Sequence, residues 1–111
     1  YGLVGSEMCI RDRYEITDVF NMPNPFSKAT NFIFQLSNRA DVTLRVYNVS
    51  GVEIWNHAMF GEEGFNSIYW EGRDHAGDRV ANGTYLYVFD VSFRDSYHRA
   101  ERVTGKAVLL R

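Results

Sequence analysis

Apolar and polar side chains alternate with a period of two along most of the chain after residue 13. Residues 32–36 and 42–46 place phenylalanine, leucine or valine at every second position, and residues 85–91 do the same with tyrosine, phenylalanine and valine. Because successive side chains of a strand point to opposite faces of a sheet, this pattern predicts half-buried β-strands. Leu86 and Val88 fill the intervening positions, which predicts a strand covered on both faces near the middle of a sheet.

Weaker patterns predict the other strands, and no stretch carries the apolar stripe of a helix. Residues 14–20 alternate Ile16, Asp18 and Phe20 against Thr17 and Val19, and the pattern stops before two prolines that cannot donate to a sheet. The further segments are a hairpin turn at Ser50-Gly51 that leads into a strand at 52–55, a glycine-bounded loop at 60–65, a strand at 66–70 with Ile68 and Trp70 on one face, and a last strand at 100–110.

Short strands separated by turn residues at this spacing are typical of one all-β architecture. Seven of them predict an antiparallel immunoglobulin-like β-sandwich spanning residues 14–111. The cysteine, tryptophan, cysteine arrangement of antibody domains is missing, because Cys9 is the only cysteine. A small barrel is the competing architecture.

The first thirteen residues do not share the pattern. Leu3–Asp12 is the residue-for-residue translation of the transposase adapter used in shotgun sequencing libraries, and the stretch lacks the apolar core of a signal peptide. We therefore expect residues 1–13 to be a scar that is disordered or loosely attached, and the chain to be a fragment of a longer bacterial protein of metagenomic origin.

Composition narrows the classes of function. The chain is 45% hydrophobic and 15% aromatic, which supports a packed core, and its net charge of -2 offers no basic patch for nucleic acid. It has no apolar run long enough to span a membrane. The expectation is a single domain, monomeric by itself, without a cofactor.

Candidate chemistry is sparse. His57, His75 and His98 lie in separate segments without metal-ligand spacing, so we expect surface histidines and no metal site. Asp74 and Asp78 bracket a glycine but lack the alternating oxygen ligands and closing glutamate of a calcium loop. No serine sits in a nucleophile elbow, and no set of nucleophile, base and orienting group is present for catalysis.

Two further features have a functional and a structural interpretation. The glycosylation sequons at Asn48 and Asn82 fall at strand and turn junctions, where asparagine tolerates left-handed geometry, and the turn interpretation is favoured. The aromatic stripe of residues 85–89 is a possible platform for bases or sugars, but in a small domain such a stripe is expected to fill the core.

Four motifs in order carry a family resemblance that covers residues 14–111. They are Pro23-Asn24-Pro25-Phe26, the hairpin ending at Gly51, Trp70-Glu71-Gly72-Arg73-Asp74 followed by Gly77, and Ala81-Asn82-Gly83-Thr84-Tyr85. With them the chain resembles the immunoglobulin-like domain of the flagellar hook-capping protein, and also the C-terminal sorting domains of the type IX secretion system. Gingipain-like cysteine peptidases and their sortase relatives often end in such a domain.

The resemblance implies a non-catalytic C-terminal module of an exported or cell-surface protein, used for secretion, sorting or anchoring. It makes the terminal segment, Lys106, Ala107, Val108, Leu109, Leu110 and Arg111, a possible sorting signal. The partners would be the secretion machinery or domains of the parent protein, and the sheet edge or last strand would be offered by strand addition. A carbohydrate- or protein-binding accessory module is the alternative, and the 70–78 segment is longer than in the compact sorting domain.

Residues 70–83 are predicted to be a structural connector. Trp70 ends an apolar face and is expected in the core, Gly72 and Gly77 allow backbone angles closed to other residues, and Asp74 can accept hydrogen bonds from nearby N–H groups. In the last strand Val108 and Leu110 would share one face and leave a cationic tip accessible.

Overall fold

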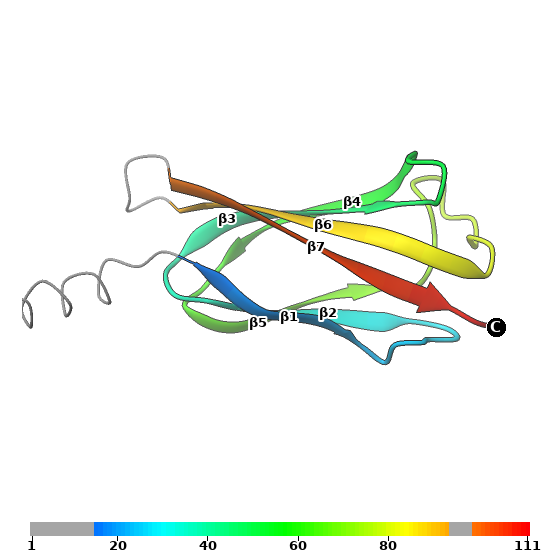
Figure 1. The fold of residues 1–111 in the computed structure, drawn as a ribbon, viewed down its shortest axis with the longest axis horizontal. Helices are drawn as coiled ribbons and strands as arrows, with labels where there is room; N and C mark the ends of the chain where they lie inside the picture. The colour runs from blue at the N-terminus through cyan, green and yellow to red at the C-terminus, as the bar shows by residue number, and fades with distance from the viewer. Residues whose placement is uncertain (1–14, 94–98) are drawn as a thin grey trace, which may run out of the picture.

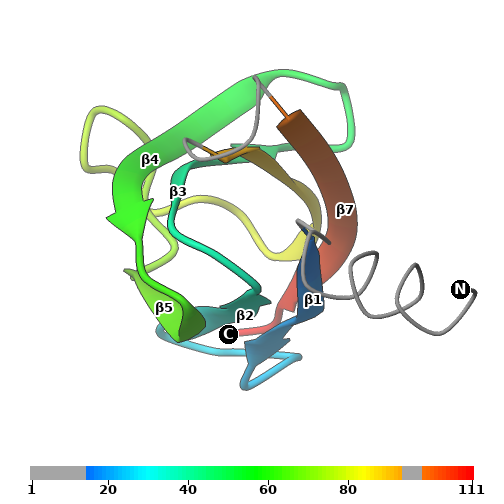
Figure 2. The ribbon, with the colours of Figure 1, turned by 90° about the vertical axis from the view of Figure 1, so that its left-hand side faces the viewer.

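A computed structural model of the chain describes residues 15–93 and 99–111. Its seven strands form two antiparallel sheets, which Figures 1 and 2 show as two layers packed face to face. The sheets have the strand orders β1-β2-β5 and β4-β3-β6-β7, so the predicted sandwich of seven strands is confirmed and the barrel alternative is wrong. The strands are β1 (Ile16–Met22), β2 (Thr30–Leu36), β3 (Ala40–Tyr47), β4 (Glu53–Gly61), β5 (Gly64–Trp70), β6 (Gly83–Phe93) and β7 (Arg99–Leu109).

The core lies between the sheets and is filled by the alternating side chains of the central strands. All the apolar positions predicted in β2 and β3 are buried, and so are Ile68, Trp70 and the aromatic stripe of β6. The rings of Phe34 and Phe89, from opposite sheets, lie 4.9 Å apart between centroids. The stripe of β6 is therefore core, as expected. Leu86 departs from the prediction, because it projects from the outer face of the four-stranded sheet and is 40% exposed.

Strand β1 does not keep the alternation predicted for it. Asp18 has a positive φ of 52°, and the pairing with β2 shifts register between Thr17 and Phe20. One extra residue in a strand moves every following side chain to the other face. Phe20 is consequently exposed although Ile16, which was predicted to share its face, is buried, and Asn21 is buried in its place.

The connections around β4 are tighter than the sequence suggested. The predicted loop at 60–65 is mostly strand, since β4 runs to Gly61 and β5 begins at Gly64. The hairpin at Ser50-Gly51 is confirmed, with Gly51 at a φ of +83°. Asn48 stabilises that turn, because its Oδ1 accepts hydrogen bonds of 3.0 Å from the backbone N–H groups of Ser50 and Val52.

Candidate functional site

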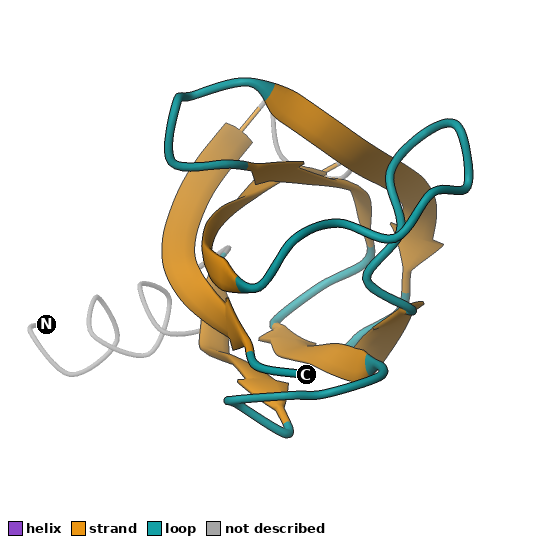
Figure 3. Ribbon diagram, turned by 90° about the vertical axis from the view of Figure 1, so that its right-hand side faces the viewer, coloured by secondary structure: helices purple, strands orange, loops and turns teal. Residues whose placement is uncertain are grey.

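Loops from three parts of the chain gather around the end of β7, as Figure 3 shows. The segment before β2 lies beside it: the N–H of Phe26 donates to Val108 O, and the N–H of Leu110 donates to Phe26 O, both at 2.9 Å. Phe26 and Leu109 thus form a short parallel bridge, and both side chains are buried. The first family motif, although it lies more than 80 positions earlier, pairs with the terminal segment.

Two asparagine side chains hold the same segment by its backbone. Asn24 Nδ2 donates to Lys106 O at 3.1 Å, and the N–H of Val108 donates to Asn24 Oδ1 at 3.0 Å. Asn82 binds the backbone of Arg111 in the same way. Asn82 Oδ1 accepts from the Arg111 N–H at 3.0 Å, and Asn82 Nδ2 donates to Arg111 O at 3.4 Å. Each amide offers one donor and one acceptor, as a neighbouring strand would. We call these two residues the asparagine clamp.

The role predicted for asparagine at the two sequons was only partly right. Among residues 15–93 and 99–111, Asp18 is the one non-glycine residue with a positive φ, so neither Asn48 nor Asn82 is used for left-handed geometry. Their side-chain amides are used instead, Asn48 within its own turn and Asn82 on the distant Arg111.

Trp70, the last residue of β5, fixes the loop that follows it to the core. It is 1% exposed, and its ring packs between those of Phe26 and Trp55, with centroid distances of 5.6 and 5.8 Å. Its indole Nε1 donates to Arg73 O at 2.9 Å, which satisfies the one polar group of a buried side chain. The same residue therefore packs the core and sets where the following loop begins.

In the loop that follows β5, the carboxylate of Asp74 accepts hydrogen bonds from the backbone of the same loop. Asp74 Oδ1 accepts hydrogen bonds of 3.0 Å from the N–H groups of Ala76 and Asp78, and the N–H of Gly77 donates to Asp74 O. Gly77 has a φ of +87°, which favours glycine. The part of the chain that the structure describes holds no cluster of three or more residues able to bind a metal ion. The loop is a connector built around Asp74.

Arg111 joins this loop to the last strand. Its guanidinium donates to Val80 O at 2.5 Å and to Gly72 O at 3.3 Å. A Cβ on Gly72 would lie 3.2 Å from Arg111 Nη2, and Gly72 has a φ of +70°, so both space and backbone angle favour glycine there. Burial raises the pKa of the nearby Tyr85 phenol and the positive charge of Arg111 partly opposes this, while the hydroxyl donates to Ala81 O.

The terminal segment alternates as expected, with one face in the core. Ala107 and Leu109 point inward and are fully buried, while Leu110 is 55% exposed and Lys106 and Arg111 lie at the surface. Sequence reasoning placed Val108 and Leu110 on one face but missed that Ala107 and Leu109 complete the core.

Two of the three histidines lie in the described part of the chain, and each is next to a different side chain. His75 Nε2 lies 3.6 Å from Glu53 Oε2, and the ring of His57 stacks on Trp55 with a centroid distance of 6.0 Å. His98 and residues 1–13 lie outside the described residues. No helix within residues 15–93 and 99–111 is long and apolar enough to cross a membrane.

Comparison with known proteins gives a family and a set of similar folds. Residues 12–105 match the family model described as CHU_C, the type IX secretion signal domain. No curated protein matches the chain. A solved structure of dimeric latent PorU from Porphyromonas gingivalis is similar over 88% of the chain, with 19% identity and a TM-score of 0.72. PorZ, described as an essential surface component of the type IX secretion system of the same organism, is similar over 85%, with 18% identity and a TM-score of 0.50.

The hook-capping protein FlgD of Xanthomonas campestris has the same fold. It is similar over 92% of this chain and 74% of its own, with 10% identity and a TM-score of 0.62. By contrast the chain spans only 9% of PorU and 12% of PorZ. It therefore corresponds in size to one domain of these larger proteins.

Proposed function

Because the chain belongs to the CHU_C type IX secretion signal domain family, we propose that residues 106–111, held by the asparagine clamp, form the surface that its secretion partner recognises. A member of this family is a non-catalytic signal module of an exported protein, located at the cell surface or outside the cell. Its partners are the secretion machinery or the protein that carries the domain.

The observation that supports residues 106–111 is the convergence of the family motifs on them. Asn24 and Phe26 of the first motif, Gly72 of the third and Asn82 of the fourth all contact this segment. These contacts fix the backbone and leave the side chains of Lys106 and Leu110 at the surface. The family match itself ends at Gly105, so the proposal depends on these contacts.

The mode of recognition proposed here is contact with side chains, whereas the sequence suggested strand addition. One edge of β7 pairs with β6 along its length, and the other edge near Val108 is occupied by Asn24 and Phe26. Few backbone groups are left there for an added strand. A partner would instead contact the exposed side chains of a preformed surface.

The test has to preserve the fold. Deleting residues 106–111 would remove Ala107 and Leu109 from the core, so failed export would report unfolding as well as a lost signal. We propose the double substitution Lys106→Glu with Leu110→Asp, because both side chains are exposed. A reporter carrying the whole domain would be expressed in a type IX-competent host, and its extracellular fraction measured.

The matched control is Arg39→Glu with Phe65→Asp, which makes the same kinds of change at exposed sites away from residues 106–111. Both variants should stay within about 0.5 kcal/mol of wild type in urea unfolding, as surface substitutions usually do. Export should fall severalfold only for the first. If it is exported like the control, residues 106–111 are not the recognised surface, and the accessory-module alternative is favoured.

A further inference from the structure

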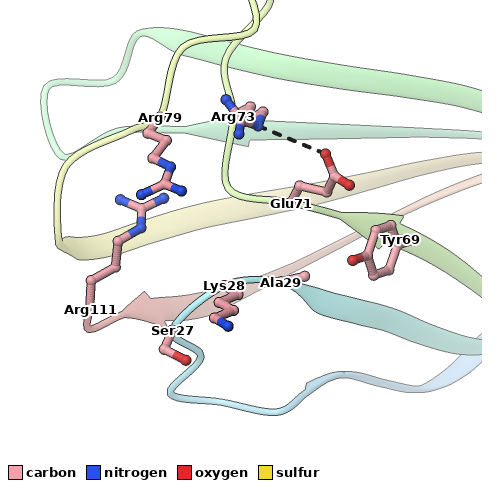
Figure 4. A pocket seen from close by; sticks show the side chains of 8 residues that line it. All are labelled: Ser27, Lys28, Ala29, Tyr69, Glu71, Arg73, Arg79 and Arg111. Carbon is pink, nitrogen blue, oxygen red and sulfur yellow. Dashed lines mark ion pairs between the residues drawn. The ribbon is translucent and has the colours of Figure 1, made fainter.

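An open groove of roughly 540 Å³ lies beside Arg111, between the segment before β2 and the loop after β5. Figure 4 shows the side chains that line it. Four of them are cationic, Lys28, Arg73, Arg79 and Arg111, and one, Glu71, is a carboxylate. The groove is therefore locally positive although the whole chain has a net charge of -2.

These cations are only partly neutralised. Glu71 Oε2 lies 3.8 Å from Arg73 Nε, at the limit of an ion pair, and both side chains are well exposed. Among the described residues, the Arg111 guanidinium donates to the backbone carbonyls of Val80 and Gly72 and to no side chain. Within residues 15–93 and 99–111, the side chains of Lys28 and Arg79 form no hydrogen bond or ion pair.

The arrangement of two guanidinium groups favours an anion. Figure 4 shows the side chains of Arg79 and Arg111 pointing toward each other across one end of the groove. Two like charges repel, and a carboxylate between them would replace that repulsion with charge-assisted hydrogen bonds. Arginine presents its donors in a planar fork that matches a carboxylate.

An exposed apolar face continues from the groove. The register of β1, β2 and β5 places Phe20 opposite Ile33, and Met22 and Tyr69 both opposite Asn31, so these side chains share the outer face of the three-stranded sheet. Phe20, Met22 and Tyr69 are exposed, and Tyr69 also lines the groove. Aromatic residues, methionine and arginine are the types enriched in protein interfaces.

We propose that the groove and this apolar face bind an acidic segment of a partner protein, with one carboxylate between Arg79 and Arg111 and apolar side chains against Tyr69 and Met22. The cations select the acidic group, and Phe20, Met22 and Tyr69 add exposed apolar area of the kind found in protein interfaces. The identity of the partner as a sorting partner rests on the proposed function, because Arg111 belongs both to residues 106–111 and to the groove.

Binding can be tested without export. The probe is a fluorescein-labelled peptide in which glutamates alternate with phenylalanine and leucine, titrated with the 111-residue chain by fluorescence anisotropy at low salt. Its control has glutamine in place of every glutamate. We expect the acidic peptide to bind more tightly than the control, and Arg79→Gln to weaken its binding by about 1.4- to fivefold, the range for one exposed charge pair.

Arg79→Gln suits this purpose because that side chain forms no hydrogen bond or ion pair with the described residues, and Arg39→Gln is the matched control that should leave binding unchanged. Met22→Ser should also weaken binding. Equal binding of the two peptides, or no effect of Arg79→Gln, overturns the inference. Binding of polygalacturonate that depends on Arg79, without peptide binding, would also overturn it and indicate a site for acidic glycans.

Export of the reporter with Arg79→Glu then tests the biological role. Reduced export supports the groove as the sorting contact, while normal export overturns that assignment. If even the unaltered domain fails to direct export, the proposed function is wrong, and the peptide titration still decides whether the groove binds acidic segments.

Discussion

Substitution of Asn24 measures how strongly the asparagine clamp holds the last strand. Asn24→Ala removes two hydrogen bonds, Nδ2 to Lys106 O and Val108 N to Oδ1. Each is worth roughly 0.5–1.5 kcal/mol net, and water can reach both backbone groups, so the expected loss is about 1–2 kcal/mol. The backbone bonds between Phe26 and residues 108 and 110 remain, so the strand should loosen locally without leaving the sheet.

The free energy of unfolding would be measured by urea denaturation, with an unchanged m value showing that the compactness of the two states is preserved. Hydrogen exchange should show faster exchange of the Val108 amide. Asn24→Asp keeps the acceptor for Val108 but loses the donor to Lys106, so its loss should be about half that of the alanine variant.

Asn56→Ala is the control, because it removes a single exposed bond to Glu53 and should cost less than about 0.5 kcal/mol. If Asn24→Ala costs no more than this control and the Val108 amide stays protected, the clamp does not hold the strand. The family motifs would then not be what fixes residues 106–111.

Four other outcomes are expected. Trp70→Ala should cost roughly 3–5 kcal/mol in urea unfolding, because it empties a buried ring site, and native-like stability would contradict its place in the core. Gly105→Ala should cost about 1–3 kcal/mol, since a Cβ there would lie 2.3 Å from the ring of Tyr87, and an unchanged melting temperature would show that the ring moves freely. Burial raises the pKa of the Tyr87 phenol above its ordinary value of 10.0. The stability that the neutral phenol contributes should therefore be complete below pH 10 and decline as pH rises through the folded-state pKa. Absorbance titration of wild type against Tyr87→Phe would detect the raised pKa. Deleting residues 1–13 should change the free energy of unfolding by less than about 1 kcal/mol, and a larger drop would show that they pack on the domain.

Local patterns in the sequence predicted most of the sandwich. The alternation in β2, β3 and β6 identified the buried faces because each strand has one face against the core. The bulge in β1 was not predicted, because aspartate tolerates a positive φ but seldom adopts one, so Asp18 alone does not mark the position. The loop at 60–65 was overestimated because both of its glycines lie inside paired strands.

The candidate site was harder to predict, because it depends on contacts between distant residues. The motifs containing Asn24, Asn82 and Gly72 were recognised separately, but nothing local shows that all three contact residues 106–111. The groove was missed for the same reason. The arginines of the 70–79 segment were read as part of a turn, and only the fold brings them close to Lys28 and Arg111.

The place of β7 in the sheet also sets when the domain can fold during synthesis and transport. Strand β7 pairs with the outer edge of β6 and supplies Ala107 and Leu109 to the core. A nascent chain that has emerged only as far as residue 100 can therefore form only β4, β3 and β6 of this sheet, and the edge of β6 stays unpaired. The earlier strands must wait as an incomplete assembly until residue 109 is available. A polypeptide broken off before that point cannot form the surface proposed for recognition, so recognition of that surface would also report that translation has passed through β7.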